Sequence, residues 1–195
     1  MTGTAIVTGA SGGIGRGVAE RLAKDGFSVV VHYSGNAAKA DAVVKAILDR
    51  GGKAESVRAD ISKADEVSQL FEQAKTKFGE IFIVVNCAGI MPLAPIATEH
   101  IDAFDKVIAT NLRGSYLVMG EAAHHVVEGG RIVLFAHTGT ICILILHLMG
   151  ALDAPELKPV WIGTANCGIA RFELRDDGFV RVLAINDTRH LTGIK

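Results

Sequence analysis

Short apolar runs alternate with longer amphipathic segments over the first two thirds of this chain. Five of the runs predict β-strands, the last of them more weakly because it is partly polar: residues 5–7, 29–31, 81–85, 132–135 and 55–59. Four segments with the period of an amphipathic helix lie between them: residues 13–25, 37–50, 62–78 and 98–127. Strands that alternate with helices indicate a parallel sheet with right-handed crossovers. The pattern therefore predicts a doubly wound, mostly parallel α/β fold with three layers.

Local signals set the ends of three of these helices. Gly26 follows the first helix, and Gly51 follows the second, at positions where a left-handed glycine commonly ends a helix. Ser62 together with Asp65 predicts a capping start for the third helix. One face of that helix is expected to be buried, through Val67, Leu70, Phe71, Ala74 and Phe78.

The pattern changes after about residue 150. Residues 165–174 and 179–185 are strand-like runs, and the Asp177-Gly178 pair between them predicts a hairpin. Residues 134–195 are therefore expected to form a β-α-β-β portion, whose antiparallel hairpin closes one edge of the sheet. Its helix is predicted in the apolar run 141–149, which is far shorter than the roughly 20 residues that span a bilayer. We expect residues 1–195 to form a single domain.

Composition and charge limit the kinds of binding partner that we expect for this chain. The chain is 49% apolar and carries a net charge of −1, which is typical of a globular protein and gives no sign of nucleic-acid binding. The three cysteines have neither paired nor metal-type spacing. We therefore expect a cytoplasmic monomer or homodimer that binds no metal and no membrane. His124 and His125 are expected to be a surface pair, because adjacent helix residues do not face each other. Cys87 is expected to be a buried structural thiol.

The most informative motif is the run from Thr8 to Gly15, Thr-Gly-Ala-Ser-Gly-Gly-Ile-Gly, directly after the first predicted strand. Glycines let the backbone turn tightly and approach a ligand closely. A strand, a glycine turn and a helix that begins near Gly13 would point free N–H groups and the positive end of the helix dipole at one place. Proteins hold pyrophosphate groups in this way. Residues 1–133 are therefore predicted to be a Rossmann-like, dinucleotide-binding portion.

Residues 1 to about 133 resemble the short-chain dehydrogenase/reductase family through four motifs in the family's order. The glycine turn is similar to the family's cofactor turn, and Asp60 lies where the family's aspartate contacts adenine. The run Asn-Cys-Ala-Gly at 86–89 is similar to the family's Asn-Asn-Ala-Gly signature, and Asn111 matches its helix asparagine. The resemblance implies a nicotinamide dinucleotide as partner. The implied cofactor residues are Gly9, Ser11, Gly13, Ile14, Gly15, Arg16, Asp60, Ile61, Asn86, Ala88 and Gly89.

The residues after the second predicted strand favour NADP over NAD. Residues 32–36, His-Tyr-Ser-Gly-Asn, contain no acid that would bind a ribose 2′-hydroxyl and repel a 2′-phosphate. Arg16 in the glycine turn adds a positive charge. The alternative interpretation of Arg16 is a solvated helix residue.

The resemblance breaks at the catalytic residues. The family uses a Ser, a Tyr and a Lys beyond the fifth strand, and these would fall near His137 and Gly150. No serine follows Ser115, and no tyrosine follows Tyr116. Because the family's tyrosine donates the proton, the usual reaction is not expected, and the missing lysine predicts weak NADP(H) binding. No catalytic residue is assigned; His137 and Asn111 are the remaining candidates.

From about residue 131, the chain is similar to the C-terminal part of the histidine phosphatase superfamily. Residues 133–141, Asn166 and residues 183–191 carry this second resemblance, which implies that His137 contacts a phosphoryl group. The superfamily's Arg-His-Gly nucleophile has no counterpart here, so phosphatase activity is not expected. The two resemblances together predict a chimera, natural or engineered, with a seam at 131–136.

Three functions remain open. The leading hypothesis is a Rossmann-like chimeric protein with weak NADP(H) binding and little or no catalysis. The first alternative is an NADP-dependent short-chain oxidoreductase that reduces a carbonyl, with His137 or a water as a non-standard acid. The second is an engineered or structural protein with an empty site. No cofactor is expected to be required for folding.

Overall fold

The computed structural model describes residues 3–92, 97–136, 169–174 and 180–187. The chain divides into two compact units, Met1–Ala136 and His137–Lys195, and each is described by itself below. Several predictions lie outside the described residues: the helix at 141–149, the candidate residue His137, the motif residue Asn166 and the last four residues of the motif at 183–191.

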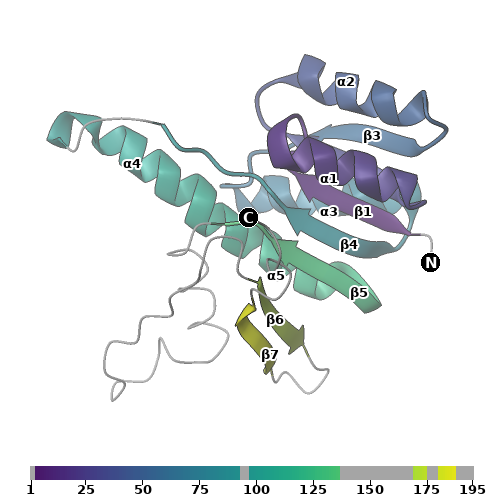
Figure 1. Cartoon of the computed structure of the whole chain (residues 1–195). Coiled ribbons are helices and arrows are strands. Elements are labelled where there is room, and N and C mark those ends of the chain that lie inside the picture. Colours follow the sequence, from purple (N-terminus) through teal and green to yellow (C-terminus); the bar gives the residue numbers. More distant parts are fainter. Residues whose placement is uncertain (1–2, 93–96, 137–168, 175–179, 188–195) are drawn as a thin grey trace, which may run out of the picture. The chain divides into compact units, whose positions relative to one another are not determined.

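The first unit is built on a five-stranded parallel sheet (Figure 1). Its strands are β1 (Thr4–Thr8), β2 (Ser28–Tyr33), β3 (Lys53–Arg58), β4 (Ile81–Asn86) and β5 (Val126–Leu134). The strand order is β3-β2-β1-β4-β5, which confirms the predicted doubly wound sheet. The direction of winding reverses between β1 and β4. In open α/β sheets, ligands bind at such a point, outside the carboxyl ends of the strands.

Helical segments cover both faces of this sheet (Figure 1). They are α1 (Gly13–Lys24), α2 (Ala37–Leu48), α3 (Ala64–Phe78), the 3₁₀ turn η1 (Thr98–His100), α4 (Ile101–Val107), the π-helical η2 (Ile108–Gly114) and α5 (Ser115–His125). Buried residues of α1 and α2 pack on one face, and those of α3 and α5 pack on the other. The three predicted layers are therefore confirmed.

The side chains of β1 show how the two cores form. Ala5 and Val7 point to the α1 and α2 face, whereas Ile6 packs with Leu70 and Phe71 of α3 on the opposite face. All five side chains are fully buried. Burial of an aliphatic or aromatic side chain of this size stabilises a fold by roughly 1.5–3 kcal/mol. A fully buried strand with three apolar central residues therefore holds both layers of helices.

The helix ends agree in part with the sequence signals. Gly26 and Gly51 follow α1 and α2 with φ of 96° and 78°, as predicted for left-handed glycines that end helices. The capping start predicted from Ser62 and Asp65 is wrong. The helix begins at Ala64, and the Ser62 hydroxyl donates instead to the Asp60 carboxylate, 2.7 Å away. The hydroxyl is thereby directed to Asp60, and the residue at the N-cap of the helix is Lys63, which makes no side-chain cap.

The segment predicted as one helix over 98–127 is helical as far as residue 125, but its hydrogen-bonding pattern changes along its length. It runs through η1, α4, η2 and α5, and it ends at His125 because β5 begins at Val126. Gly114 lies at the end of the wide π-helical turn, where an added Cβ would come within 2.8 Å of the Ile61 side chain. The small residue therefore lets this turn lie directly on the residue that follows Asp60.

The described part of the second unit is a two-stranded antiparallel sheet of β6 (Ile169–Leu174) and β7 (Val180–Asp187). Leu174 pairs with Val180, as the hairpin signal at Asp177-Gly178 predicts. Closure of the parallel sheet by this hairpin stays a prediction. No helix within the described ranges is long and apolar enough to cross a membrane.

Candidate cofactor site

The turn between β1 and α1 depends on its glycines for two different reasons. Gly9 and Gly13 have φ of 64° and 54°, in the left-handed region that glycine adopts most readily. A Cβ on Gly9 would come within 2.8 Å of the Ala88 backbone, and a Cβ on Gly15 would collide with the Gly9 carbonyl. At Gly13, in contrast, a Cβ would meet nothing within 4 Å. The turn is therefore packed closely against backbone at Gly9 and Gly15, whereas the space next to Gly13 is open.

The open side of this turn is the N-terminus of α1. Its N-cap residue, Gly12, offers no side-chain cap, and the first turn of the helix carries no acidic residue. The N–H groups of a first helical turn have no acceptor within the helix, and the helix dipole adds positive potential there. Residues 12–14 are exposed, and Ile14 is an apolar side chain with 64% exposure. The arrangement suits an anionic group that carries an adjoining apolar surface.

A buried polar network joins this turn to the end of β4. The Thr8 hydroxyl donates to Asn86 Oδ1 at 2.5 Å and accepts the N–H groups of Cys87 and Ala88, each at 3.1 Å. Asn86 Nδ2 donates to the Ser115 hydroxyl of α5 at 3.0 Å. The loop after β4 is thus fixed against the glycine turn at the switch point of the sheet.

Asn111 holds the next residues of the same loop. Its side chain accepts the Ile90 N–H at 2.8 Å and donates to the Ile90 carbonyl at 2.7 Å. Its own carbonyl accepts the Ser115 hydroxyl at 2.7 Å. The amide of Asn111 therefore clamps the loop that carries Gly89, and a direct part in catalysis stays a prediction.

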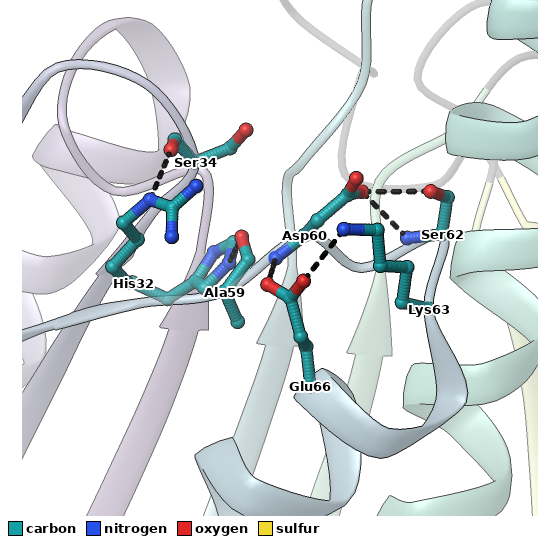
Figure 2. Close-up of polar contacts among 8 residues, drawn as sticks. His32, Ser34, Ala59, Asp60, Ser62, Lys63 and Glu66 are labelled. Carbon is teal, nitrogen blue, oxygen red and sulfur yellow. Dashed lines mark hydrogen bonds and ion pairs between the residues drawn. The ribbon is translucent and has the colours of Figure 1, made fainter.

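Asp60 lies just beyond the end of β3 as a charged acceptor (Figure 2). Its carboxylate accepts the hydroxyl and the N–H of Ser62, at 2.7 and 3.0 Å, and the hydroxyl bond does most to lower the pKa of Asp60. Its N–H donates to Glu66 of α3 at 2.7 Å. The Ile61 side chain is buried in the core, so this residue could meet a ligand through its backbone rather than its side chain.

The side chain of Arg16 lies along α1 and bonds a residue one turn further on in the same helix. Its guanidinium bonds Glu20 at 2.7 Å, and Arg50 bonds the same carboxylate at 3.0 Å; these hydrogen bonds lower the pKa of Glu20. The side chain of Arg16 is half exposed. This geometry agrees with the alternative of a solvated helix residue, and contact of Arg16 with a phosphate stays a prediction.

Two residues near the carboxyl ends of β2 and β3 were missed by the sequence reasoning. His32, at the end of β2, is buried and bonds Gly9. It also bonds Ala59 (Figure 2). Arg58, at the end of β3, is exposed, and its Nε donates to the Ser34 carbonyl at 3.3 Å. The positions of both side chains follow from the pairing of β1, β2 and β3, which brings residues 9, 32 and 59 to one edge of the sheet.

Two further sequence candidates are Cys87 and the histidine pair of α5. Cys87 is partly buried, and burial raises the pKa of its thiol to about 11, which disfavours the reactive thiolate. That it is a structural thiol stays a prediction. The surface pair predicted at His124 and His125 is wrong for His125, which packs on Phe71 and lies 3.2 Å from Glu121. Within the described residues, no group of three or more His, Cys, Asp or Glu side chains could hold a metal ion.

A parallel sheet of order 3-2-1-4-5 with a glycine turn after β1 defines a Rossmann-type protein. The short chain dehydrogenase family profile matches residues 3–139, and this chain belongs to that family. The comparisons give no support to the resemblance to histidine phosphatases or to a chimera.

Particular relatives agree with this assignment. An uncharacterized oxidoreductase of Methylorubrum extorquens is 34% identical over 97% of this chain and 93% of its own length. Versicolorin reductase 1 of Dothistroma septosporum is 40% identical over 67% of this chain. A putative dehydrogenase of Burkholderia cenocepacia, solved with bound NADP, is 28% identical over 68% of this chain, with a TM-score of 0.64. The chain spans about half the length of the last two proteins.

Proposed function

We propose that this chain binds NADP(H) at the switch point of its sheet and is a short-chain oxidoreductase that reduces a carbonyl group. The observation that carries the proposal is the turn from Gly9 to Gly15. It presents an uncapped helix N-terminus without acidic residues, and it is open above Gly13. Family membership and the NADP-bound relative support the same ligand.

The residues present fit each part of such a dinucleotide. The first-turn N–H groups of α1 would bind the pyrophosphate, with Ser11 and Ile14 beside it. The Asp60 carboxylate would accept a hydrogen bond from the adenine amino group. The backbone from Asn86 to Gly89, fixed by Thr8 and Asn111, would border the ribose and nicotinamide half.

The residues around the end of β2 support NADP rather than NAD. Residues 32–36 offer no carboxylate to repel a 2′-phosphate. Among the described residues, the exposed guanidinium of Arg58 is bonded only to the Ser34 carbonyl, through Nε, so its terminal nitrogens can donate toward this edge. Arg58 thereby joins Arg16 as a cation that could recognise a 2′-phosphate.

When bound, NADPH supplies the hydride; the chain itself must place a proton on the carbonyl oxygen. The sequence has no tyrosine after Tyr116, so this acid is a non-standard group, His137 or a water. The same observation favours a second candidate function, in which the protein binds NADP(H) weakly and catalyses little or nothing. A chimera with the histidine phosphatases would give this second function a structural origin.

Cofactor binding is tested by titration with NADPH, following the fluorescence of the nicotinamide. We expect Gly13→Asp to abolish binding, because a carboxylate at this position repels the phosphates and fills their space. Gly13→Asn is the matched control, since asparagine has the same size and also tolerates a positive φ, but is neutral. It should lose less affinity than the aspartate variant. Absence of binding to the wild-type chain at millimolar NADPH would contradict the proposal and leave the empty-site alternative.

Activity is tested by following NADPH absorbance with a panel of aldehydes and ketones. Turnover that is lost in His137→Ala would support the oxidoreductase with a non-standard acid. Turnover that survives in this variant would assign the proton to water or to another group. NADPH binding without turnover of any carbonyl would leave the second candidate, a binding protein with impaired catalysis.

A further inference from the structure

His32 joins the three strand ends that make up the adenine side of the site. Its side chain is 1% exposed. Nδ1 accepts the N–H of Gly9 at 3.1 Å. Nε2 lies 3.0 Å from the carbonyl oxygen of Ala59, the residue before Asp60 (Figure 2). Its backbone carbonyl also accepts the N–H of Ala10 at 2.9 Å. One residue of β2 thus bonds two successive residues of the glycine turn and the end of β3.

The Gly9 N–H and the Ala59 carbonyl determine the tautomer and the protonation state of the His32 ring. The backbone N–H of Gly9 can only donate, so Nδ1 must be an unprotonated acceptor. The carbonyl of Ala59 can only accept, so Nε2 must carry the proton. A neutral imidazole has one nitrogen of each kind, whereas the imidazolium carries a proton on both. Protonation of His32 would therefore set an N–H of the ring against the N–H of Gly9 and break this bond.

The surroundings also favour the neutral ring. Burial lowers the pKa of His32 below its ordinary value of 6.5, while the Ala59 carbonyl and the Asp60 carboxylate act in the opposite direction. Residues 4–15, which form the neighbouring strand β1 and the turn that bonds the ring, contain no titratable side chain. At the carboxyl end of β3, the charged groups are Arg58 and, just beyond the strand, Asp60, and these are bonded to Ser34 and Ser62, respectively.

The position of Gly9 controls the start of α1. Gly9 has a left-handed φ of 64°, and its carbonyl lies so close to Gly15 that no side chain fits between them. A glycine has more backbone freedom than any other residue, so this conformation needs an external constraint. The bond from the Gly9 N–H to the imidazole supplies one. A shift of Gly9 would be passed on to Gly15 and to the N–H groups of the first helical turn.

We propose that His32 is a positioning residue for the cofactor turn: its neutral ring, with the proton on Nε2, holds Gly9 where the first turn of α1 can bind the pyrophosphate. This inference rests on the proposed NADP(H) binding and assigns to His32 a part in it.

Two substitutions of His32 separate its two side-chain bonds. In His32→Asn, the amide oxygen takes the place of Nδ1, so the acceptor for Gly9 is kept and the donor to Ala59 is lost. In His32→Gln, the amide nitrogen takes the place of Nε2, so the donor to Ala59 is kept and the acceptor for Gly9 is lost. We expect His32→Gln to raise the Kd for NADPH at pH 8 at least about tenfold, and His32→Asn by less than about threefold.

Thermal unfolding of both variants is the control. A merely structural His32 would lower the stability of both without separating their Kd values. Equal Kd values for the two folded variants, or a wild-type Kd for His32→Gln, would overturn the proposal.

Nuclear magnetic resonance of the full chain tests the arrangement without cofactor. Long-range ¹H–¹⁵N spectra of the seven histidine rings should show His32 with a protonated Nε2 and an unprotonated Nδ1 from pH 8 to 6. Amide hydrogen exchange at Gly9 should be faster in His32→Gln than in His32→Asn. The opposite tautomer, or an imidazolium at neutral pH, would overturn the proposal. If these results are as expected but the wild-type chain fails to bind NADPH, the proposed function fails and the role of His32 in holding the turn stands.

Discussion

Thr8 has no exposed surface, and its hydroxyl joins the end of β1 to the loop after β4. It makes three hydrogen bonds at once, one as donor to Asn86 and two as acceptor from Cys87 and Ala88. A hydroxyl can do this because it carries one proton and two lone pairs. At the scale of single residues, the site is therefore held by groups that do not themselves face a ligand.

Thr8→Val tests the worth of this hydroxyl. Valine keeps the shape of threonine but leaves the Asn86 oxygen and two N–H groups without their partner. Because unpaired buried polar groups are costly, we expect a loss of roughly 2–4 kcal/mol in the free energy of unfolding, measured with urea. Thr8→Ser is the control: it keeps the hydroxyl, removes one methyl group and should cost about 1 kcal/mol or less. Similar losses in the two variants would show that the methyl group matters more than the hydrogen bonds.

Residues differ in how far the sequence predicts their part in the site. Gly9, Gly13 and Gly15 were predictable because a tight turn and a close backbone approach are local requirements. The role of His32 was not, because it depends on the register that pairs Val7 with Val31 and so brings residues 9 and 32 together. Strands buried on both faces have no alternating pattern that would reveal their register.

At the scale of elements, η2 and α5 differ in how closely they approach the sheet. Gly114 touches Ile61 with no room for a side chain, whereas Gly120, in the middle of α5, is exposed and has open space. The strand and helix positions were predictable from hydrophobic runs, since each element buries a whole face. The π-helical turn was not, because the Asn111 side chain within it bonds the backbone of Ile90, which belongs to another segment. The start of α3 was not, because the Ser62 hydroxyl bonds the Asp60 carboxylate two residues before it.

The same substitution at these two glycines should have opposite effects. Gly114→Ala puts a methyl group within 2.8 Å of the buried Ile61 side chain, and overpacking of this kind costs about 1–3 kcal/mol. Gly120→Ala adds a methyl group in solvent and should stabilise the helix by about 0.5–1 kcal/mol. Denaturant midpoints of the two variants measure the difference. A neutral or stabilising Gly114→Ala would mean that η2 can move away from Ile61 without loss.

At the scale of the whole molecule, groups with depressed pKa values make the fold sensitive to acid in two stages. The pKa of His32 lies below 6.5 because the ring is buried. The folded state therefore binds fewer protons than the unfolded state once the pH falls below 6.5, and stability is lost as the pH decreases. The carboxylates of Glu20, Asp60 and Glu66 also have lowered pKa values, through their hydrogen-bond partners, and they add a second loss below about pH 4.5.

We expect the free energy of unfolding to be level between about pH 7 and 8, and to fall again at higher pH because burial raises the pKa of the Cys87 thiol in the folded state. Below pH 6.5, it should fall by up to about 1.4 kcal/mol per pH unit for the one proton of His32, and more steeply below about pH 4.5. Urea unfolding at a series of pH values measures the curve. His32→Asn should be less stable at pH 8 but should lack the first decline. A first decline of unchanged slope in that variant would assign it to another histidine.

The outer strand of the described sheet bears on how the protein behaves in concentrated solution. β3 lies at one edge of this sheet, and an edge strand offers backbone groups with which another chain can pair. Lys53 and Arg58 lie exposed at its two ends, and Glu55 between them forms an ion pair with Lys77. A second copy that added its own strand here would have to strip water from these charges. The charges that weaken β3 in the hydrophobic pattern thus disfavour the addition of a second copy of the chain at this edge.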